Sequence, residues 1–372
     1  MRQSTEPAPG AAPPAPRGRR RGPLAIPATL SVLTVLAVGG AVAVARLAHT
    51  DVDQAAATEA TPSAPVASGS LPPPGSASPS AATPGASQGL GARPTTSGSA
   101  SPSAAKPSAA TALTGFPGAG NTGVPNGVRL STHSGSCTIT KANTVIDKRH
   151  VRCSLLIKAK NVVIRSSRVD GTIRLEGAGH SLRIEDSEID GGRAYEHTVG
   201  FENLTVLRSE IRGGQTSVNC YRNCLIQDSW LHGQYVPDGE DWHLNAFLSN
   251  GGSDIRLVHN TLACTPPTNA AGGGCTANAS IFGDFGPNSN YTIRDNLFVA
   301  SSQMSYCFYG GYDEKKQYGT QISGIVVTGN VFQRGGNGKC GFHGPATSWA
   351  RSAPGNVWQD NVWSDGKALP PD

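Results

Sequence analysis

The stretch "NVVIRSSRV" (residues 161–169) has apolar side chains at alternate positions, then two serines, then another apolar residue. Seven later segments repeat this pattern: "HSLRIEDSEI" (180–189), "ENLTVLRSEI" (202–211), "RNCLIQDSWL" (222–231), "SDIRLVHNTL" (253–262), "SNYTIRDNLF" (289–298), "SGIVVTGNVF" (323–332) and "GNVWQDNVW" (355–363). One small polar residue recurs in every segment: Ser167, Ser187, Ser209, Ser229, Asn260, Asn296, Asn330 and Asn361. Its spacing is 20, 22, 20, 31, 36, 34 and 31 residues.

A repeat of this period is typical of a solenoid, in which each unit stacks on its neighbours. Alternation within each unit favours strands over helices, and the Gly, Asp and Ser residues between units indicate turns. A unit of about 20 residues has room for three short strands and their bends. The sequence therefore predicts an all-β, single-stranded parallel β-helix over residues 115–372.

The recurring Ser and Asn residues have a structural explanation. Residues at one bend of a solenoid stack between coils, so their side chains can hydrogen-bond to their counterparts one coil away. Asn also tolerates the left-handed conformation that a bend demands. We expect this series to form a ladder rather than a catalytic site.

Coil length changes along the chain. From Ser229 onward each coil carries roughly ten extra residues compared with the first coils. Loops inserted on a repeat scaffold usually gather on its binding face. We therefore expect the functional residues to lie between Gln234 and Gly344.

The first 114 residues have a different composition. Residues 1–22 are a basic tail containing "PRGRRRG", and residues 23–46 are an apolar run closed by Arg46. About 20 apolar residues span a bilayer, with positive charge inside. The run predicts a single-pass signal-anchor with everything after it outside the cell membrane, or a cleaved signal and a secreted protein. Residues 47–114, rich in Ala, Pro, Ser and Gly, predict a disordered stalk.

Most of the net charge of +5 belongs to this N-terminal region. Up to Gly115 there are eight of the 31 Lys and Arg residues and four of the 26 Asp and Glu residues, which leaves 23 against 22. A nucleic-acid-binding domain usually has a concentrated excess of basic residues. We therefore expect no nucleic-acid partner, and a membrane contact only through the N-terminal segment.

All eight cysteines fall after residue 115, and an even count in an exported domain predicts disulfides. Neighbours in sequence are the natural partners: Cys137 with Cys153, Cys220 with Cys224, Cys264 with Cys275, and Cys307 with Cys340. Only "CYRNC" (220–224) approaches the spacing of a zinc site, which would need a second pair nearby.

With the repeat and the opening phrase "GFPGAGNTGVPNGVRL" (115–130), the chain resembles exported bacterial proteins of the pectate-lyase-like superfamily. The resemblance covers about Phe116 to Gly366 and implies a right-handed parallel β-helix. It also implies polysaccharide chemistry, by lyases that often use calcium and an Arg or Lys base, or by hydrolases with paired Asp.

A frequent phrase in these relatives, H-x-D-[G/A]-[I/V/F]-Q, matches His243-Leu244-Asn245-Ala246-Phe247-Leu248. His243 is kept, but Asn245 replaces the Asp and cannot ionise. Strand alternation places His243 and Asn245 on one face, which we expect to point outward, and Leu244 on the other. The substitution argues against catalysis by the relatives' route.

The candidate residues fall into three groups. His243, Asp241 and Asp284 are candidates for acid and base catalysis. Asn245, Trp242, Tyr312 and His343 are candidates for contacting a sugar, since aromatic rings pack on its apolar C–H faces. Asp238 and Glu240 are candidate calcium ligands, although "PDGED" also fits a solvated turn.

Two functions remain. The first is an extracytoplasmic polysaccharide lyase or hydrolase acting on an acidic or cell-wall glycan, with calcium as its one candidate cofactor. The second is a non-catalytic envelope protein that binds a glycan, or forms a surface structure, through the same groove.

Overall fold

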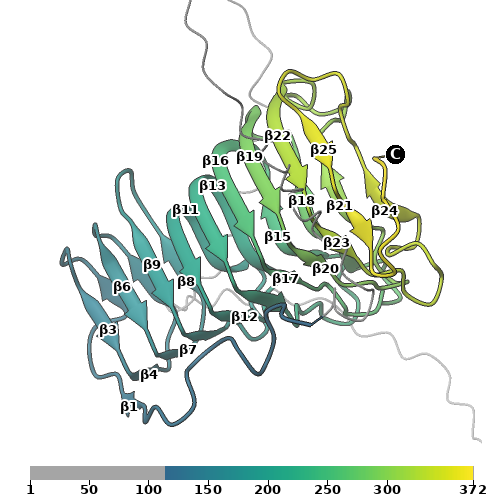
Figure 1. Cartoon of the computed structure of the whole chain (residues 1–372). Helices are drawn as coiled ribbons and strands as arrows, with labels where there is room; N and C mark the ends of the chain where they lie inside the picture. The colour runs from purple at the N-terminus through teal and green to yellow at the C-terminus, as the bar shows by residue number, and fades with distance from the viewer. Residues whose placement is uncertain (1–113, 372) are drawn as a thin grey trace, which may run out of the picture. The chain divides into compact units, whose positions relative to one another are not determined.

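The computed structural model describes residues 114–371, and every regular element among them is a β-strand. The predicted tail (1–22), membrane segment (23–46) and nearly all of the stalk (47–114) lie outside these residues. Within 114–371 there is no helix of the length and apolarity needed to cross a membrane. The strands are stacked along one axis, from the first coils to the last (Figure 1).

Sheet A has ten parallel strands, one from each coil. They are β1 (Ser131–Thr132), β4 (Arg149–Val151), β7 (Arg168–Asp170), β10 (Glu188–Asp190), β12 (Glu210–Arg212), β14 (Trp230–His232), β17 (Thr261–Leu262), β20 (Leu297–Phe298), β23 (Val331–Phe332) and β26 (Val362–Trp363).

The second sheet has 16 strands and two faces, because the long strands β11 (His197–Leu207) and β13 (Thr216–Gln227) belong to both. Face B1 joins their first halves to β2 (Thr138–Ile139), β5 (Leu155–Ile157), β8 (Ile173–Leu175), β15 (His243–Ser249), β18 (Gly274–Ile281), β21 (Tyr306–Gly310) and β24 (Gly344–Thr347). Face B2 joins their second halves to β3 (Val145–Asp147), β6 (Val162–Arg165), β9 (Leu182–Glu185), β16 (Gly252–Val258), β19 (Asn288–Arg294), β22 (Ile322–Thr328) and β25 (Val357–Gln359).

These parallel strands in stacked sheets form a β-helix-like solenoid, so the prediction of an all-β parallel solenoid is confirmed at this level. Alternate residues point into a continuous core: in β6, Val162 and Ile164 are fully buried while Val163 is half-buried and Arg165 exposed. Like residues also stack between coils, as in the parallel rings of Phe298 and Phe332, whose centroids are 4.3 Å apart.

The Ser and Asn ladder is confirmed. The backbone N–H of each member donates to the side-chain oxygen of the next, from Ser167 through to Asn361, at 2.9–3.2 Å. The ladder lies between faces B2 and A and every member is buried. The left-handed residue is not the ladder residue itself but the one before it, for example Asp295 (φ 58°) before Asn296. That detail of the prediction was wrong.

All four predicted disulfides are present: Cys137–Cys153, Cys220–Cys224, Cys264–Cys275 and Cys307–Cys340. The cysteines of "CYRNC" are bonded to each other and are not free for zinc. The extra residues of the later coils form loops on both sides of face B1: residues 233–242, 263–273, 299–305 and 333–343 before its strands, and 282–287 and 311–321 after them.

Candidate functional site

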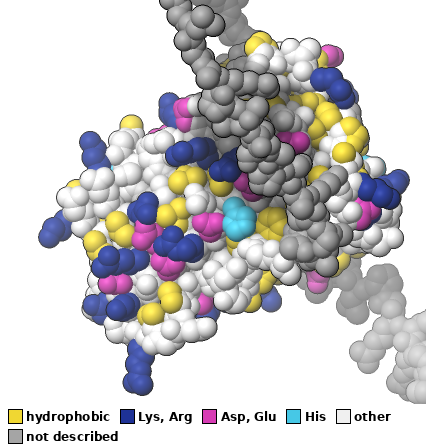
Figure 2. Space-filling model, viewed as in Figure 1, with side chains coloured by type: hydrophobic (Ala, Val, Ile, Leu, Met, Phe, Trp, Pro, Cys, Tyr) yellow, Lys and Arg dark blue, Asp and Glu magenta, His cyan; other side chains and the backbone are white. Residues whose placement is uncertain are grey.

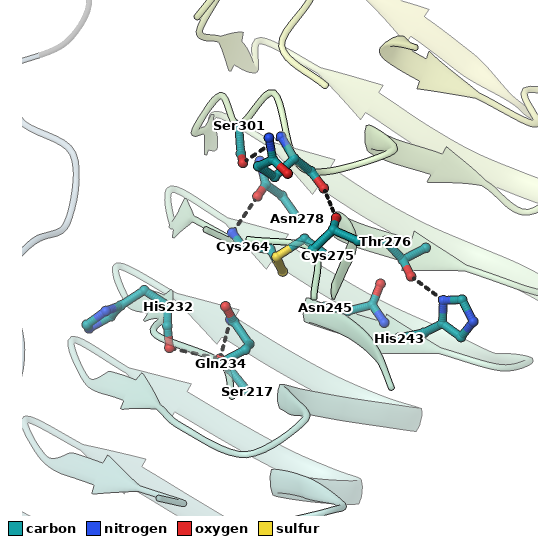
Figure 3. The surroundings of a disulfide bond; sticks show 12 residues. Ser217, His232, Gln234, His243, Asn245, Cys264, Cys275, Thr276, Asn278 and Ser301 are labelled. Carbon is teal, nitrogen blue, oxygen red and sulfur yellow. Dashed lines mark hydrogen bonds between the residues drawn. A yellow bond between two sulfur atoms is a disulfide. The ribbon is translucent and has the colours of Figure 1, made fainter. Parts of the chain in front are cut away.

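His243 lies at the start of β15, at the edge of face B1 where the loops that precede its strands lie. It is exposed, and its Nδ1 lies 3.4 Å from the Thr276 hydroxyl on the next coil (Figure 3). The adjoining loop is fixed by the Cys264–Cys275 disulfide and by Asn278, whose carboxamide accepts from the Cys264 N–H and donates to the Val299 carbonyl, both at 2.8 Å. The edge around His243 is therefore a firmly built surface.

Asn245 is buried, with 2% of its surface exposed, and its Oδ1 accepts a 2.6 Å hydrogen bond from the Ser280 hydroxyl. The prediction that it points outward beside His243, free to contact a ligand, was wrong. The β15–β18 register shifts between Leu244 and Asn245, so simple alternation does not hold there. Asn245 links two coils in this structure.

Asp284 does not join His243. The register pairs His243 with Gly274 and Ser249 with Ile281, so Asp284 follows the opposite end of the strand pair. At about 3.3 Å per residue the two side chains start roughly 20 Å apart. Asp284 instead forms an ion pair with Lys316. An acid and a base must both reach the reacting group, so the predicted catalytic pair of His243 and Asp284 is not formed.

The acidic residues before His243 form an exposed turn. Asp238, Glu240 and Asp241 are all exposed, and the Glu240 N–H donates to the Pro237 carbonyl. Asn269 donates to the carbonyls of Pro237 and Glu240, which pins the turn to the next loop. Among residues 114–371 no three His, Cys, Asp or Glu side chains are grouped to share a metal ion. The calcium site at Asp238 and Glu240 therefore stays a prediction, with no third His, Cys, Asp or Glu grouped with them among the described residues.

Trp242 lies in an aromatic cluster that the sequence did not reveal. Its ring makes edge contacts with Tyr195 at 5.0 Å and Tyr235 at 6.3 Å, and the Arg193 guanidinium lies 5.1 Å from the Tyr235 ring. Trp242 and Tyr235 are half-buried, whereas Tyr195 is 58% exposed. We call Tyr195, Tyr235 and Trp242 the Trp242 cluster. Its members come from loops of two coils, which explains why no local motif marks them.

His343 belongs to a second aromatic cluster three coils further on. Its ring stacks on Tyr306 at 5.4 Å and meets Phe342 edge-on at 4.8 Å, and Tyr306 contacts Tyr309. Phe342 is 62% exposed. We call Tyr306, Tyr309, Phe342 and His343 the Tyr306 cluster. Phe342 and His343 border a hollow of about 660 Å³ that Ser302, Gln303, Asn337 and Lys339 also line. Tyr312 is not part of it, since it packs on the core and donates to Glu314.

The outer side of sheet A carries charged rows that the sequence did not mark. Glu210 accepts from His232 at 2.9 Å, which holds the pKa of that carboxyl below its usual value, and the Trp230 ring stacks on His232 at 3.5 Å. Arg168 and Arg212 pair with Asp170 and Asp190 in the same way. Each of these charged side chains is paired with another one, so we expect the rows to stabilise the stacking of the coils.

His197, at the start of β11, is the most perturbed histidine of the described chain. Burial lowers its pKa to about 4, and the nearby Arg174 charge acts in the same direction. The ring packs against Phe201 at 4.3 Å. It is therefore neutral in the folded protein at neutral pH and packs as an apolar group.

This histidine predicts an acid-sensitive stability. His197 binds a proton near pH 6.5 in the unfolded chain but only near pH 4 in the folded chain. Between pH 4 and pH 6.5 the unfolded state therefore holds more protons than the folded state. The free energy of unfolding should fall as pH drops through this window, by about 3 kcal/mol in total. Denaturation of wild type and His197→Gln at pH 7, 5.5 and 4.5 tests this. The free energy of unfolding should fall less steeply with pH in the variant than in wild type. Equal falls in the two proteins would contradict the prediction.

No protein-family model, no curated protein and no solved structure is significantly similar to this chain.

Proposed function

We propose that the solenoid is an extracytoplasmic glycan-binding protein that holds a polysaccharide along the loop-flanked edge of face B1. The observation that carries this proposal is the pair of exposed aromatic clusters on that edge. Trp242 precedes β15 and His343 precedes β24, with β18 and β21 between them. Three steps of about 4.8 Å give roughly 14 Å between the clusters along the axis.

The chemistry of the edge suits a sugar chain. Aromatic rings pack on the apolar C–H faces of sugars, and Tyr and Trp can also hydrogen-bond at one end. Exposed polar groups lie between and beside the clusters, including His243, Thr276 and Gln303. An extended chain could therefore rest on both clusters while its hydroxyls meet side chains and water.

Binding without turnover fits the geometry better than a lyase or hydrolase. Among residues 114–371 no carboxylate pairs with His243, Asp284 is at the far end of the strand pair, and Asn245 is buried and cannot ionise. Of the two functions that the sequence left open, we therefore favour the non-catalytic glycan-binding one.

The more specific assignments are part of this proposal. Stacked parallel strands and the internal Asn ladder support a right-handed β-helix related to pectate-lyase-like proteins. Four disulfides favour an oxidising compartment outside the cytoplasm. A single-pass anchor at residues 23–46 and a stalk over 47–114 would then hold the solenoid beyond the cell membrane.

The test removes the two most exposed aromatic side chains of the edge. Tyr195→Ala and Phe342→Ala should each weaken polysaccharide binding several-fold, and about tenfold together, because each removes an aromatic surface while leaving the core intact. Affinity electrophoresis of the full-length chain against xylan, dextran and soluble peptidoglycan measures this.

Phe285→Ala is the matched control, since Phe285 is 75% exposed but lies in the loop after β18, whereas Tyr195 and Phe342 lie in loops that precede strands of face B1. It should bind as wild type does. If none of these glycans retards the wild-type chain, or if Phe285→Ala weakens binding equally, the edge is not the binding surface.

A further inference from the structure

Face B2 carries a groove on its outer side, away from the edge described above. It encloses about 530 Å³ across five coils, from β6 to β16. Its floor is one row of outward residues in register: Val163 beside Arg183, then Thr205, then Leu225, then Arg256. The row is thus apolar or β-branched except for two arginines.

The groove is basic. Lys160, Arg183 and Arg256 line it together with His180, and none of the described Asp and Glu residues does. Arg183 is paired with Glu185 on the same strand. Neither Lys160 nor Arg256 forms a hydrogen bond or ion pair through its side chain with any residue of the described range, and both are exposed. This differs from the paired charges of sheet A. Lys and Arg side chains are spread over the N-terminal coils in Figure 2.

One wall of the groove offers carboxamides in a row. Asn161, Asn203 and Asn223 occupy equivalent bends with φ of 52–56°, and the Asn223 amide donates to Asn203 at 2.9 Å. All three asparagines line the groove, from the coils of β6, β11 and β13. Carboxamides provide donors and acceptors for sugar hydroxyls.

We propose that this groove is a second binding site, which takes an extended anionic polysaccharide lying along the solenoid axis. Lys160 and Arg256 meet the anionic groups of the polysaccharide, since guanidinium and ammonium groups bind carboxylates by charge-assisted hydrogen bonds. Val163 and Leu225 contact the sugar rings. Lys160, just before β6, and Arg256 in β16 are four coil steps apart, about 19 Å along the axis, so a ligand must be a chain rather than a single sugar to reach both.

The experiment uses a matched pair of probes, carboxymethyl-dextran and unmodified dextran, titrated into the full-length chain by calorimetry. Carboxymethyl-dextran should bind, and its affinity should fall about threefold in Lys160→Ala and in Arg256→Ala and about tenfold in the double variant. Both side chains are exposed, so the fold should persist. Arg129→Ala is the control, since Arg129 is also exposed and unpaired among residues 114–371 but lies outside the groove.

Three results would overturn the proposal: the groove variants bind carboxymethyl-dextran as wild type does, Arg129→Ala weakens binding equally, or inorganic polyphosphate binds as tightly as the glycan. The last would show a general anion site in which the apolar floor has no role. In the Tyr195→Ala with Phe342→Ala background, Lys160→Ala and Arg256→Ala should still weaken binding of carboxymethyl-dextran and leave binding of unmodified dextran unchanged, so failure here and failure of the face B1 proposal are distinguishable.

Discussion

Asn296→Ala should destabilise the solenoid by about 3–5 kcal/mol, one of the two largest effects that we expect. The side chain is fully buried and makes four hydrogen bonds. Its Oδ1 accepts from the backbone N–H and the carboxamide of Asn260, both at 2.9 Å. Its Nδ2 donates to the Leu257 carbonyl at 2.9 Å and to Asn330 at 3.0 Å. Alanine would remove the side-chain partner of the Asn260 N–H and of the Leu257 carbonyl, while the Asn260 carboxamide keeps its bond to Ile226 and Asn330 Oδ1 keeps its bond to the residue 296 N–H.

Chemical denaturation of the full-length chain measures the change in the free energy of unfolding. Asn126→Ala is the control, since Asn126 is exposed in the segment before β1, and it should change stability by less than about 0.5 kcal/mol. A loss in Asn296→Ala below about 1 kcal/mol would show that the ladder does not hold the coils together.

Removing the Cys307–Cys340 disulfide, as Cys307→Ala with Cys340→Ala, should cost about 4 kcal/mol. The bond joins residues 33 apart and so restricts the unfolded chain strongly. The same double change at Cys220 and Cys224, only 4 apart, should cost about 2 kcal/mol on the same chain-entropy argument.

Both pairs include fully buried cysteines, so the comparison controls in part for lost packing. Denaturant midpoints and slopes of the two double variants give the two free energies. Equal losses, or a larger loss at Cys220–Cys224, would contradict the view that the long disulfide stabilises the C-terminal coils by restricting the unfolded chain.

Much of the fold was predictable because the information is local and repeated. Alternation in "NVVIRSSRV" specifies a strand, and the spacing of Ser167 and its counterparts specifies how coils stack. The disulfides followed from neighbours in sequence, since a solenoid keeps residues of one coil, and of adjacent coils, close together. The left-handed conformation was assigned to the ladder residue, but the residue before it has the positive φ. The two residues are adjacent in every repeat, and the sequence does not show which of them has a positive φ.

The candidate site was less predictable, since it depends on register. A shift after Leu244 breaks the alternation on which the outward position of Asn245 rested. His243 and Asp284 are far apart because His243 lies at the start of the β15–β18 strand pair and Asp284 follows its end, which the sequence alone does not show. Tyr195 and Trp242 come from different coils, so their contact has no signature in either segment.

We propose that the edge of face B1 binds a glycan without turnover. One incubation of the full-length chain with polysaccharides that it binds tests this directly. Unsaturated products would be followed by ultraviolet absorbance, and new reducing ends by colorimetry. We expect binding that Tyr195→Ala with Phe342→Ala weakens about tenfold, and no product above a protein-free blank. Product formation that His243→Ala abolishes would contradict it and establish an enzyme at this edge.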